Sequence, residues 1–274
     1  MKKDTVVLIS GCSSGIGLAL AREFDRRGYY VFATARRAST VDIRSSRADI
    51  SSLDVTNTKS IEMCVKHVMR QAGKIDILIN NAGYALMGPV VDLSMDDFRR
   101  QFDTNVTGLV GLTQAVAPHM IKQRSGTIVN ISSVSGFLTQ PFSGAYCATK
   151  AAVNSLSDAM RMELAPFGVR VVTVQPGSIK SQFGETAAKG LDRYERSVYA
   201  PVKEFIEARA MTSQQNPTTA EEFSKELITR LEGKKVPPVI RLGNDSLRLF
   251  LESKLPLKTL DRMLSKRYGL DGLK

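Results

Sequence analysis

The sequence predicts an α/β fold in which a parallel, doubly wound sheet carries helices on both faces. Three observations lead to this prediction. Candidate strands and helices alternate over about the first 175 residues, the order that a parallel sheet with crossover helices requires. The candidate strands are short apolar runs without polar alternation, as expected for strands buried on both faces. A glycine-rich turn, Gly11 to Gly17, separates the first strand from the first helix.

Each element follows from a local pattern. Apolar runs predict strands at residues 5–10, 29–34, 50–54, 75–80, 127–132, 169–175 and 237–242. Helical periodicity marks residues 18–27, 61–71, 97–122, 144–166 and 219–231. Gly28 ends the first of these helices, and Thr219 with Glu222 forms the capping box that begins the last.

The chain reads as one domain with an insert and a tail. We expect the domain to span residues 1–243 and the tail residues 244–274. Residues 178–216 are polar with scattered aromatics, which is typical of a lid over a site. The tail is amphipathic and basic and is broken at Pro256. Residues 234–274 hold ten Lys/Arg and four Asp/Glu, so a net +6 of the chain's +11 lies there.

The composition argues against several classes of protein. The 274 residues are 43% hydrophobic and 24% charged, as in soluble globular proteins. No apolar run approaches the roughly 18 residues of a membrane span, and residues 6–9 are too short for a signal-peptide core. Cys12, Cys64 and Cys147 read as free thiols of a cytoplasmic protein. Two histidines argue against a zinc site, and no basic run is interleaved with aromatics as in a nucleic-acid surface.

The glycine-rich turn predicts a nucleotide site and therefore a Rossmann-type fold. Glycines allow the backbone to approach a pyrophosphate, and the N-terminus of the following helix offers free N–H groups. The residues expected at the phosphates are Gly11, Ser13, Ser14, Gly15, Ile16 and Gly17. A tight strand–helix turn is the alternative, but the position at the first strand–helix junction favours the nucleotide.

The end of the second predicted strand favours NADP(H) over NAD(H). NAD-specific sites place a carboxylate there for the ribose 2′-hydroxyl, whereas arginine suits a 2′-phosphate. The chain has Arg36 and Arg37 and no carboxylate. We expect Arg36 to contact the 2′-phosphate; two solvated arginines at a helix start are the alternative.

Tyr146 and Lys150 form the pair with the clearest chemistry. Residues four apart share one face of a helix. We expect the lysine to pull the tyrosine pKa down, so that the phenol can exchange a proton with a carbonyl or an alcohol. An ordinary helix surface would show the same spacing.

With these residues in hand, the chain resembles the short-chain dehydrogenase/reductase family, in its single-domain branch. The resemblance covers about residues 3–242. It rests on motifs in the family's order: the Gly11–Gly17 loop, Leu53-Asp54-Val55, Asn80-Asn81-Ala82-Gly83, Asn105, Ser133, Tyr146 with Lys150, and Pro176-Gly177.

The resemblance implies further roles. Asp54 would bond the adenine beside Val55, and Asn81, Ala82 and Gly83 would lie along the adenosine ribose. Ile179 and Ser181 would contact the carboxamide end, Lys150 the nicotinamide ribose, and Asn105 a water linked to Lys150. Ser133 would hold the substrate oxygen, although Ser132 and Ser135 are also candidates from the residues alone.

The implied activity is reversible reduction of a ketone or aldehyde by NADPH, with Tyr146 as proton donor. Tails like this one occur in relatives resembling 17β-hydroxysteroid dehydrogenases, retinol dehydrogenases and acyl-dihydroxyacetone-phosphate reductases, which suggests a small or lipophilic substrate. Phe142 and Phe183 are expected to contact this substrate together with Ser133.

We expect a homo-oligomer, with a dimer favoured. The tail could pack on a dimer partner, line the pocket entrance or touch anionic lipid. The alternatives are an NAD-linked alcohol dehydrogenase and a non-catalytic NADP-binding regulator.

Overall fold

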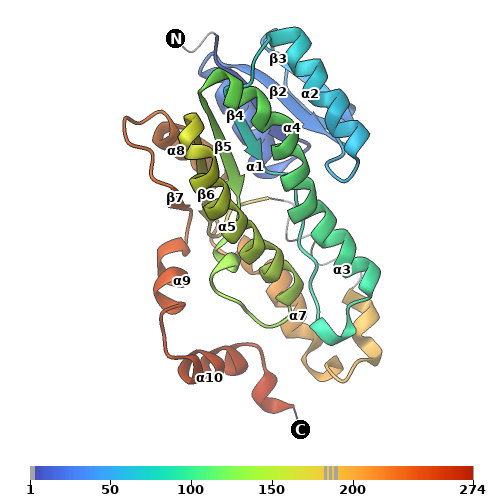
Figure 1. Ribbon diagram of the computed structural model, residues 1–274. Coiled ribbons are helices and arrows are strands. Elements are labelled where there is room, and N and C mark those ends of the chain that lie inside the picture. The colour runs from blue at the N-terminus through green and yellow to red at the C-terminus, as the bar shows by residue number, and fades with distance from the viewer. Residues whose placement is uncertain (1–3, 182–183, 185–186, 188–190, 274) are drawn as a thin grey trace.

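A single parallel sheet of seven strands organises the molecule (Figure 1). The computed structural model describes residues 4–181, 184, 187 and 191–273. The strand order is β3-β2-β1-β4-β5-β6-β7, with every pair parallel. The strands are β1 Val6–Ser10, β2 Tyr30–Ala35, β3 Ala48–Ser52, β4 Ile77–Asn80, β5 Gly126–Ile131, β6 Val169–Pro176 and β7 Val239–Leu242. The predicted doubly wound, Rossmann-type fold is confirmed.

Helices cover both faces of the sheet. The helices are α1 Gly15–Arg26, α2 Thr58–Ala72, α3 Met95–Phe102, α4 Gly108–Gln123, α5 Gly144–Leu164, α7 Lys203–Met211, α8 Ala220–Leu231, α9 Ser246–Glu252 and α10 Leu257–Arg267. Side chains of α1 and α8 share one apolar cluster with the sheet, and those of α2, α4 and α5 share another. The two clusters lie on opposite faces of the sheet.

Strand β1 illustrates why its residues are apolar without alternation. Successive side chains of a strand point to opposite faces. Val7 and Ile9 belong to the cluster of α1 and α8, whereas Val6 and Leu8 belong to the cluster of α2 and α4. Both faces are therefore buried, and each position needs an apolar side chain.

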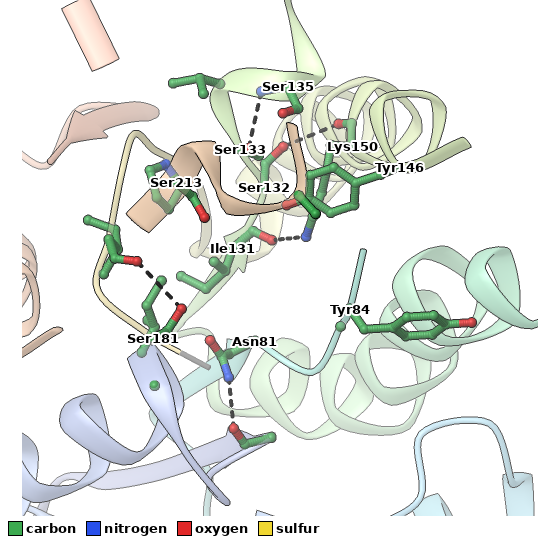
Figure 2. Close-up of a pocket in the computed structure, with 18 of the residues that line it drawn as sticks. Asn81, Tyr84, Ile131, Ser132, Ser133, Ser135, Tyr146, Lys150, Ser181 and Ser213 are labelled. Atoms are coloured by element: carbon green, nitrogen blue, oxygen red, sulfur yellow. Dashed lines mark hydrogen bonds between the residues drawn. The ribbon is translucent and has the colours of Figure 1, made fainter. Parts of the chain in front are cut away.

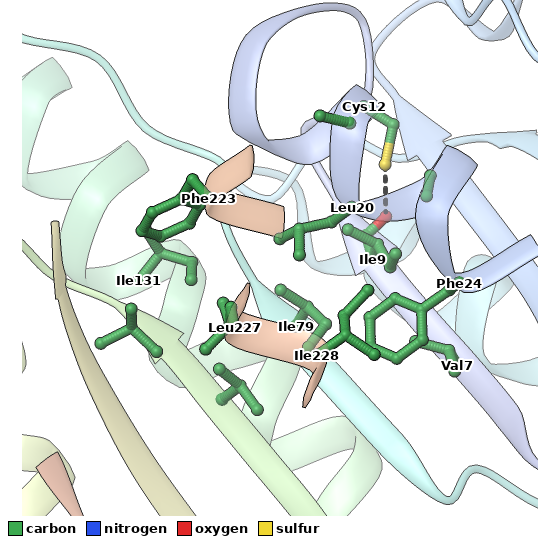
Figure 3. Close-up of a cluster of buried hydrophobic side chains, with 14 of the residues drawn as sticks. Val7, Ile9, Cys12, Leu20, Phe24, Ile79, Ile131, Phe223, Leu227 and Ile228 are labelled. Atoms are coloured by element: carbon green, nitrogen blue, oxygen red, sulfur yellow. Dashed lines mark hydrogen bonds between the residues drawn. The ribbon is translucent and has the colours of Figure 1, made fainter. Parts of the chain in front are cut away.

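Helix α8 closes the first face late in the chain. Its Phe223, Leu227 and Ile228 are buried against residues of β1, β4 and α1 (Figure 3). The predicted capping box begins this helix, with the Thr219 hydroxyl accepting from the Glu222 N–H.

Among the elements whose ranges differ from the predicted ones are β3, α1 and the long helix before β5. Strand β3 ends two residues earlier than expected because its register with β2 pairs Ala35 with Ser52. Helix α1 begins at Gly15, so the last two glycines of the loop lie in its first turn. The expected helix at residues 97–122 is divided by a π-helical turn, Asp103–Thr107, between α3 and α4. A wider turn of this kind often marks a functional position.

The predicted lid contains helix α7, and the tail packs on it. Leu264 and Tyr268 of the tail are buried in one apolar cluster with Ile206 of α7, Met87 and Phe142. The tail thus runs from β7 past α5 to the end of the molecule where α7 lies (Figure 1). Within the described residues, no helix is both long and apolar enough to cross a lipid bilayer.

Candidate functional site

A cavity of about 1060 Å³ opens at the carboxyl ends of the strands. Chain segments following β1, β2, β4, β5 and β6 all contribute to its wall. After β1 the chain continues to β2 on one side, and after β4 it continues to β5 on the other side. The connections leaving these two neighbouring strands therefore diverge, and a crevice is expected between them. The cavity is therefore where this topology places a ligand.

The glycine-rich loop forms one end of the cavity with tight backbone packing. Gly11 has φ +77°, a conformation that favours glycine. A Cβ on Gly17 would lie 2.2 Å from the Gly11 carbonyl oxygen. The Asn81 side-chain amide donates to the carbonyls of Ser10 and Gly11, at 3.0 Å each, and ties the loop to the end of β4. Figure 2 shows Asn81 with one of these bonds.

The N-terminus of α1 has no side-chain cap from Ser14 and no acidic residue in its first turn. Free N–H groups and the positive end of the helix dipole therefore face the cavity without a protein counter-charge from this turn. An anion such as a pyrophosphate fits there.

The structure brings every predicted cofactor residue to this cavity. Those lining it are Gly11, Ser13, Ser14, Gly15, Ile16, Gly17, Arg36, Asp54, Val55, Asn81, Ala82, Gly83, Tyr146, Lys150, Ile179 and Ser181. Arg36 is exposed at the rim, whereas its neighbour Arg37 is not part of the lining. The Asp54 carboxylate also accepts hydrogen bonds from the Thr56 N–H and hydroxyl, so it orders its own turn as well as facing the cavity.

Tyr146, Lys150 and Ser133 meet in the middle of the cavity wall (Figure 2). Tyr146 and Lys150 lie one turn apart on α5, and Ser133 follows β5. Lys150 Nζ donates to the Ile131 carbonyl at 2.8 Å and lies 5.8 Å from the centre of the Tyr146 ring. Ser133 Oγ accepts from the Ser135 N–H, which orients the hydroxyl.

Burial controls the titration of this pair. It raises the pKa of Tyr146 to about 12, against the smaller lowering effect of the Ser133 hydrogen bond. It also lowers the pKa of Lys150 to about 8. The expectation that the Tyr146 pKa lies below its usual value is wrong in this structure, because burial of the phenol outweighs the groups that lower its pKa, Ser133 and Arg209.

Asn105 lies behind the cavity wall and is not part of its lining. It is 1% exposed, in the π-helical turn. Its side-chain amide donates to the Tyr84 carbonyl and to Thr149 Oγ1, and its oxygen accepts from the Tyr84 N–H. Asn105 therefore holds the segment after Gly83 against α5. Its predicted role in holding a water stays a prediction.

The predictions of substrate-binding residues agree less well with the structure. Phe142 does not line the cavity; it is buried in the apolar cluster behind Tyr146, with its ring against Tyr199 and Tyr268. The predicted place of Phe142 at the substrate is wrong, because its side chain packs into this apolar cluster; its backbone has φ +62°. Phe183 lies outside the described residues. Met87, an apolar residue of the same cluster as Phe142, does line the cavity.

Sequence reasoning missed the contributions of the lid and the tail. Arg209 of α7 lines the cavity at 7% exposure. Arg248, Leu249, Arg267 and Tyr268 of the tail line it as well. No local signal marks them, because an arginine in a polar segment has the pattern of a solvated residue. The structure thus assigns the tail to the cavity wall, one of the three roles expected for it. Among the described residues, no group of three His, Cys, Asp or Glu is placed to hold a metal ion.

The chain matches known proteins along most of its length. The family model described as short chain dehydrogenase matches residues 5–192. The short-chain dehydrogenase cctT of Talaromyces islandicus is 42% identical over 179 residues, 64% of this chain and 63% of that protein, so the match spans less than two thirds of this relative. The NADPH-dependent 1-acyldihydroxyacetone phosphate reductase of Schizosaccharomyces pombe is 33% identical over 244 residues, 85% of this chain and 80% of that protein.

Solved structures show the same architecture. A short-chain dehydrogenase from Streptomyces avermitilis superimposes with a TM-score of 0.79 at 28% identity, covering 98% of both chains. The closed form of a serine dehydrogenase complexed with NADP⁺ superimposes with a TM-score of 0.76 at 30% identity, covering 87% of this chain and 94% of that one. The family model, these relatives, the parallel sheet and the site residues agree, and the chain belongs to the short-chain dehydrogenase/reductase family.

Proposed function

We propose that the protein is an oxidoreductase that reduces the carbonyl group of a small or lipophilic ketone or aldehyde with NADPH. One observation carries the proposal: the phenol of Tyr146, the hydroxyl of Ser133 and the ammonium of Lys150 line the same cavity as the Gly11–Gly17 loop. A proton donor, an oxygen-binding hydroxyl and a phosphate-binding loop then serve one bound pair of reactants.

The residues of the cavity fit a dinucleotide. The loop and the uncapped N-terminus of α1 would hold the pyrophosphate, Asp54 and Val55 the adenine, and Lys150 the nicotinamide ribose. Arg36 supports a 2′-phosphate, hence NADP(H), because it is exposed at the rim with no carboxylate beside it in the sequence. When bound, the reduced nicotinamide supplies a hydride to the carbonyl carbon.

The side chains of the protein supply the proton and stabilise the developing charge. With a pKa of about 12, Tyr146 is a phenol at neutral pH, the form that can donate. Its proton passes to the carbonyl oxygen, which becomes the alcohol hydroxyl, while the Ser133 hydroxyl donates a hydrogen bond to that oxygen. The tyrosinate left behind is stabilised by the Lys150 ammonium and regains a proton from water.

Replacing Tyr146 by Phe tests the proton donor. We expect Tyr146→Phe to keep its affinity for NADPH and to lose at least about 100-fold in the rate of carbonyl reduction, since general acid catalysis contributes on that scale. Tyr30→Phe, on β2, is the matched control. Turnover retained in Tyr146→Phe would remove the assignment. Binding of NADPH without turnover of any carbonyl in the unaltered protein would favour the non-catalytic regulator instead.

The proposed preference for NADP(H) has its own test. We expect Arg36→Asp to lower the ratio of kcat/KM for NADPH to that for NADH by at least about 10-fold, because it exchanges an attractive charge at the 2′-phosphate for a repulsive one. Arg37→Asp, which changes the adjacent charge outside the cavity lining, is the control. Equal ratios in the two variants, or a preference of the unaltered protein for NADH, would favour the NAD-linked alcohol dehydrogenase.

Assembly and location are proposals that rest on the sequence. A homodimer and contact of the basic tail with anionic lipid are supported by exposed Leu247, Leu251 and Leu257 among lysines and arginines of the tail. A cytoplasmic location is supported by the three free cysteines. Light scattering at two concentrations tests the dimer. Co-sedimentation with anionic and with neutral vesicles tests the lipid contact.

A further inference from the structure

Arg209 is a buried cation in the wall of the proposed active-site cavity. It lies on the lid helix α7 and is 7% exposed. Its neighbours on this helix that also line the cavity are Phe205, Ala208 and Ala210, which carry no charge. An arginine side chain in such a place has lost most of its water, and a guanidinium without water needs an anionic or hydrogen-bonding partner.

The other arginines near the substrate end of the cavity have such partners. Arg248 pairs with Asp245 at 2.9 Å and with Glu252 at 3.3 Å, and Arg267 pairs with Glu252 at 2.8 Å. Their charges are therefore already balanced within the protein.

Arg209 differs from them. Within the described part of the chain, no carboxylate forms an ion pair with it, and its buried Nε has no hydrogen-bond partner. A buried charge left unpaired is unfavourable, because neither water nor a carboxylate compensates for its lost hydration. Arg209 also lowers the pKa values of both Tyr146 and Tyr268, so its charge is felt at the proton donor. The unpaired guanidinium thus lies on the Tyr146 side of the cavity, whereas Arg36 stands beyond the end of β2.

We propose that Arg209 binds an anionic group of the substrate, so that the preferred substrate is a carbonyl compound carrying a carboxylate or a phosphate. This inference rests on the proposed carbonyl reduction. The planar guanidinium can donate two parallel hydrogen bonds to either oxyanion. Such a contact would fix the distance between the anion and the carbonyl beside Tyr146, and it would draw α7 onto the bound substrate. The apolar cluster around Met87 and Tyr268 would accommodate the rest of the molecule.

Pairs of probes, one with an anionic group and one without, test this assignment. The pairs are acetoacetate and methyl acetoacetate, levulinate and methyl levulinate, and dihydroxyacetone phosphate and dihydroxyacetone. The acetoacetate pair and the levulinate pair differ in the distance between the carbonyl and the carboxylate. The dihydroxyacetone pair tests a phosphate in place of a carboxylate. The kcat/KM of each probe with NADPH would be measured for the unaltered protein, Arg209→Met and Arg209→Lys. Arg196→Met, at an exposed arginine of the lid segment outside the cavity, is the matched control.

We expect at least one anionic probe to be preferred over its neutral partner by roughly 10- to 100-fold, the scale of a charge-assisted contact in a buried site. Arg209→Met should abolish this preference, so that the charged and neutral probes of a pair react at equal rates, while keeping the affinity for NADPH. Arg209→Lys should keep part of the preference, and Arg196→Met all of it. Equal rates for charged and neutral probes would overturn the inference. So would weaker NADPH binding in Arg209→Met with the preference intact, since Arg209 would then serve the cofactor.

Thermal unfolding of the complex with NADP⁺ separates this inference from the proposed function. If no probe is reduced, the proposed activity on such carbonyls fails. Stabilisation of the unaltered protein by an anionic probe, absent in Arg209→Met and in the presence of the neutral partner, would still support the anion site. Absence of any such stabilisation, together with absence of a preference in turnover, would refute it. The same unfolding curves establish that each variant is folded.

Discussion

Replacing Gly17 by Ala should loosen the glycine-rich loop and weaken NADPH binding without unfolding the protein. A Cβ at this position would lie 2.2 Å from the Gly11 carbonyl oxygen and 2.4 Å from Asn81 Nδ2, where an ordinary contact begins at 3.4 Å. The loop would have to move by more than about an ångström. The shift also strains the two hydrogen bonds from Asn81 to the carbonyls of Ser10 and Gly11.

The size of the effect follows from these contacts. Overpacking of this kind costs about 1–3 kcal/mol, and each strained hydrogen bond adds about 1 kcal/mol. The total of about 3–5 kcal/mol lies below the middle of the range of about 5–15 kcal/mol that is usual for a domain, so we expect the variant to fold. The displaced loop also loses alignment with the pyrophosphate, and one charge-assisted hydrogen bond is worth about 1.5–3 kcal/mol. The Kd for NADPH should therefore rise by roughly 10- to 100-fold.

Fluorescence of NADPH reports binding, and the chain contains no tryptophan to complicate the signal. Urea unfolding reports stability. Gly111→Ala is the matched control, since its Cβ would meet only the end of the Ile61 side chain, at 3.3 Å, and alanine favours the helix. An affinity for NADPH in Gly17→Ala within about two-fold of the unaltered protein, at equal stability, would refute the reasoning about close packing in the loop.

Two further predictions concern proton transfer and stability. The kcat/KM for carbonyl reduction should fall as pH rises through about 8, because Lys150, whose pKa is about 8, is charged below that pH and neutral above it. Lys150→Arg should move this fall to higher pH. A fall at the same pH in both proteins would exclude Lys150 as its cause. Arg27→Met should lower the free energy of unfolding, measured in urea, by about 2–3 kcal/mol. It breaks the 2.7 Å ion pair with Glu232, which links the C-terminal ends of α1 and α8, and the Arg27 side chain is only 11% exposed. Arg26→Met, at an exposed arginine, should lower it by less than about 1 kcal/mol.

The fold could be predicted from local patterns because a parallel sheet imposes them. Strands buried on both faces need continuous apolar runs, and helices covering them need an apolar stripe. Element boundaries were less predictable, as at β3, where pairing with β2 moved the strand by two residues. The π-helical turn that divides residues 97–122 could not be predicted either, because no local pattern marks it; it holds Asn105, whose hydrogen bond to the Tyr84 carbonyl is a tertiary contact.

The sequence by itself determined the doubly wound sheet and the meeting of the glycine loop, Asn81, Ser133, Tyr146 and Lys150 in one cavity. It did so because parallel strands end at one edge, so residues that follow different strands come together there. Only the tertiary structure decided what surrounds that centre. Burial, which depends on every neighbouring element, raises the pKa of Tyr146 instead of lowering it. No local pattern fixes where the lid segment and the amphipathic tail pack, so the placement of Arg209 and Tyr268 at the cavity is seen only when the chain is folded.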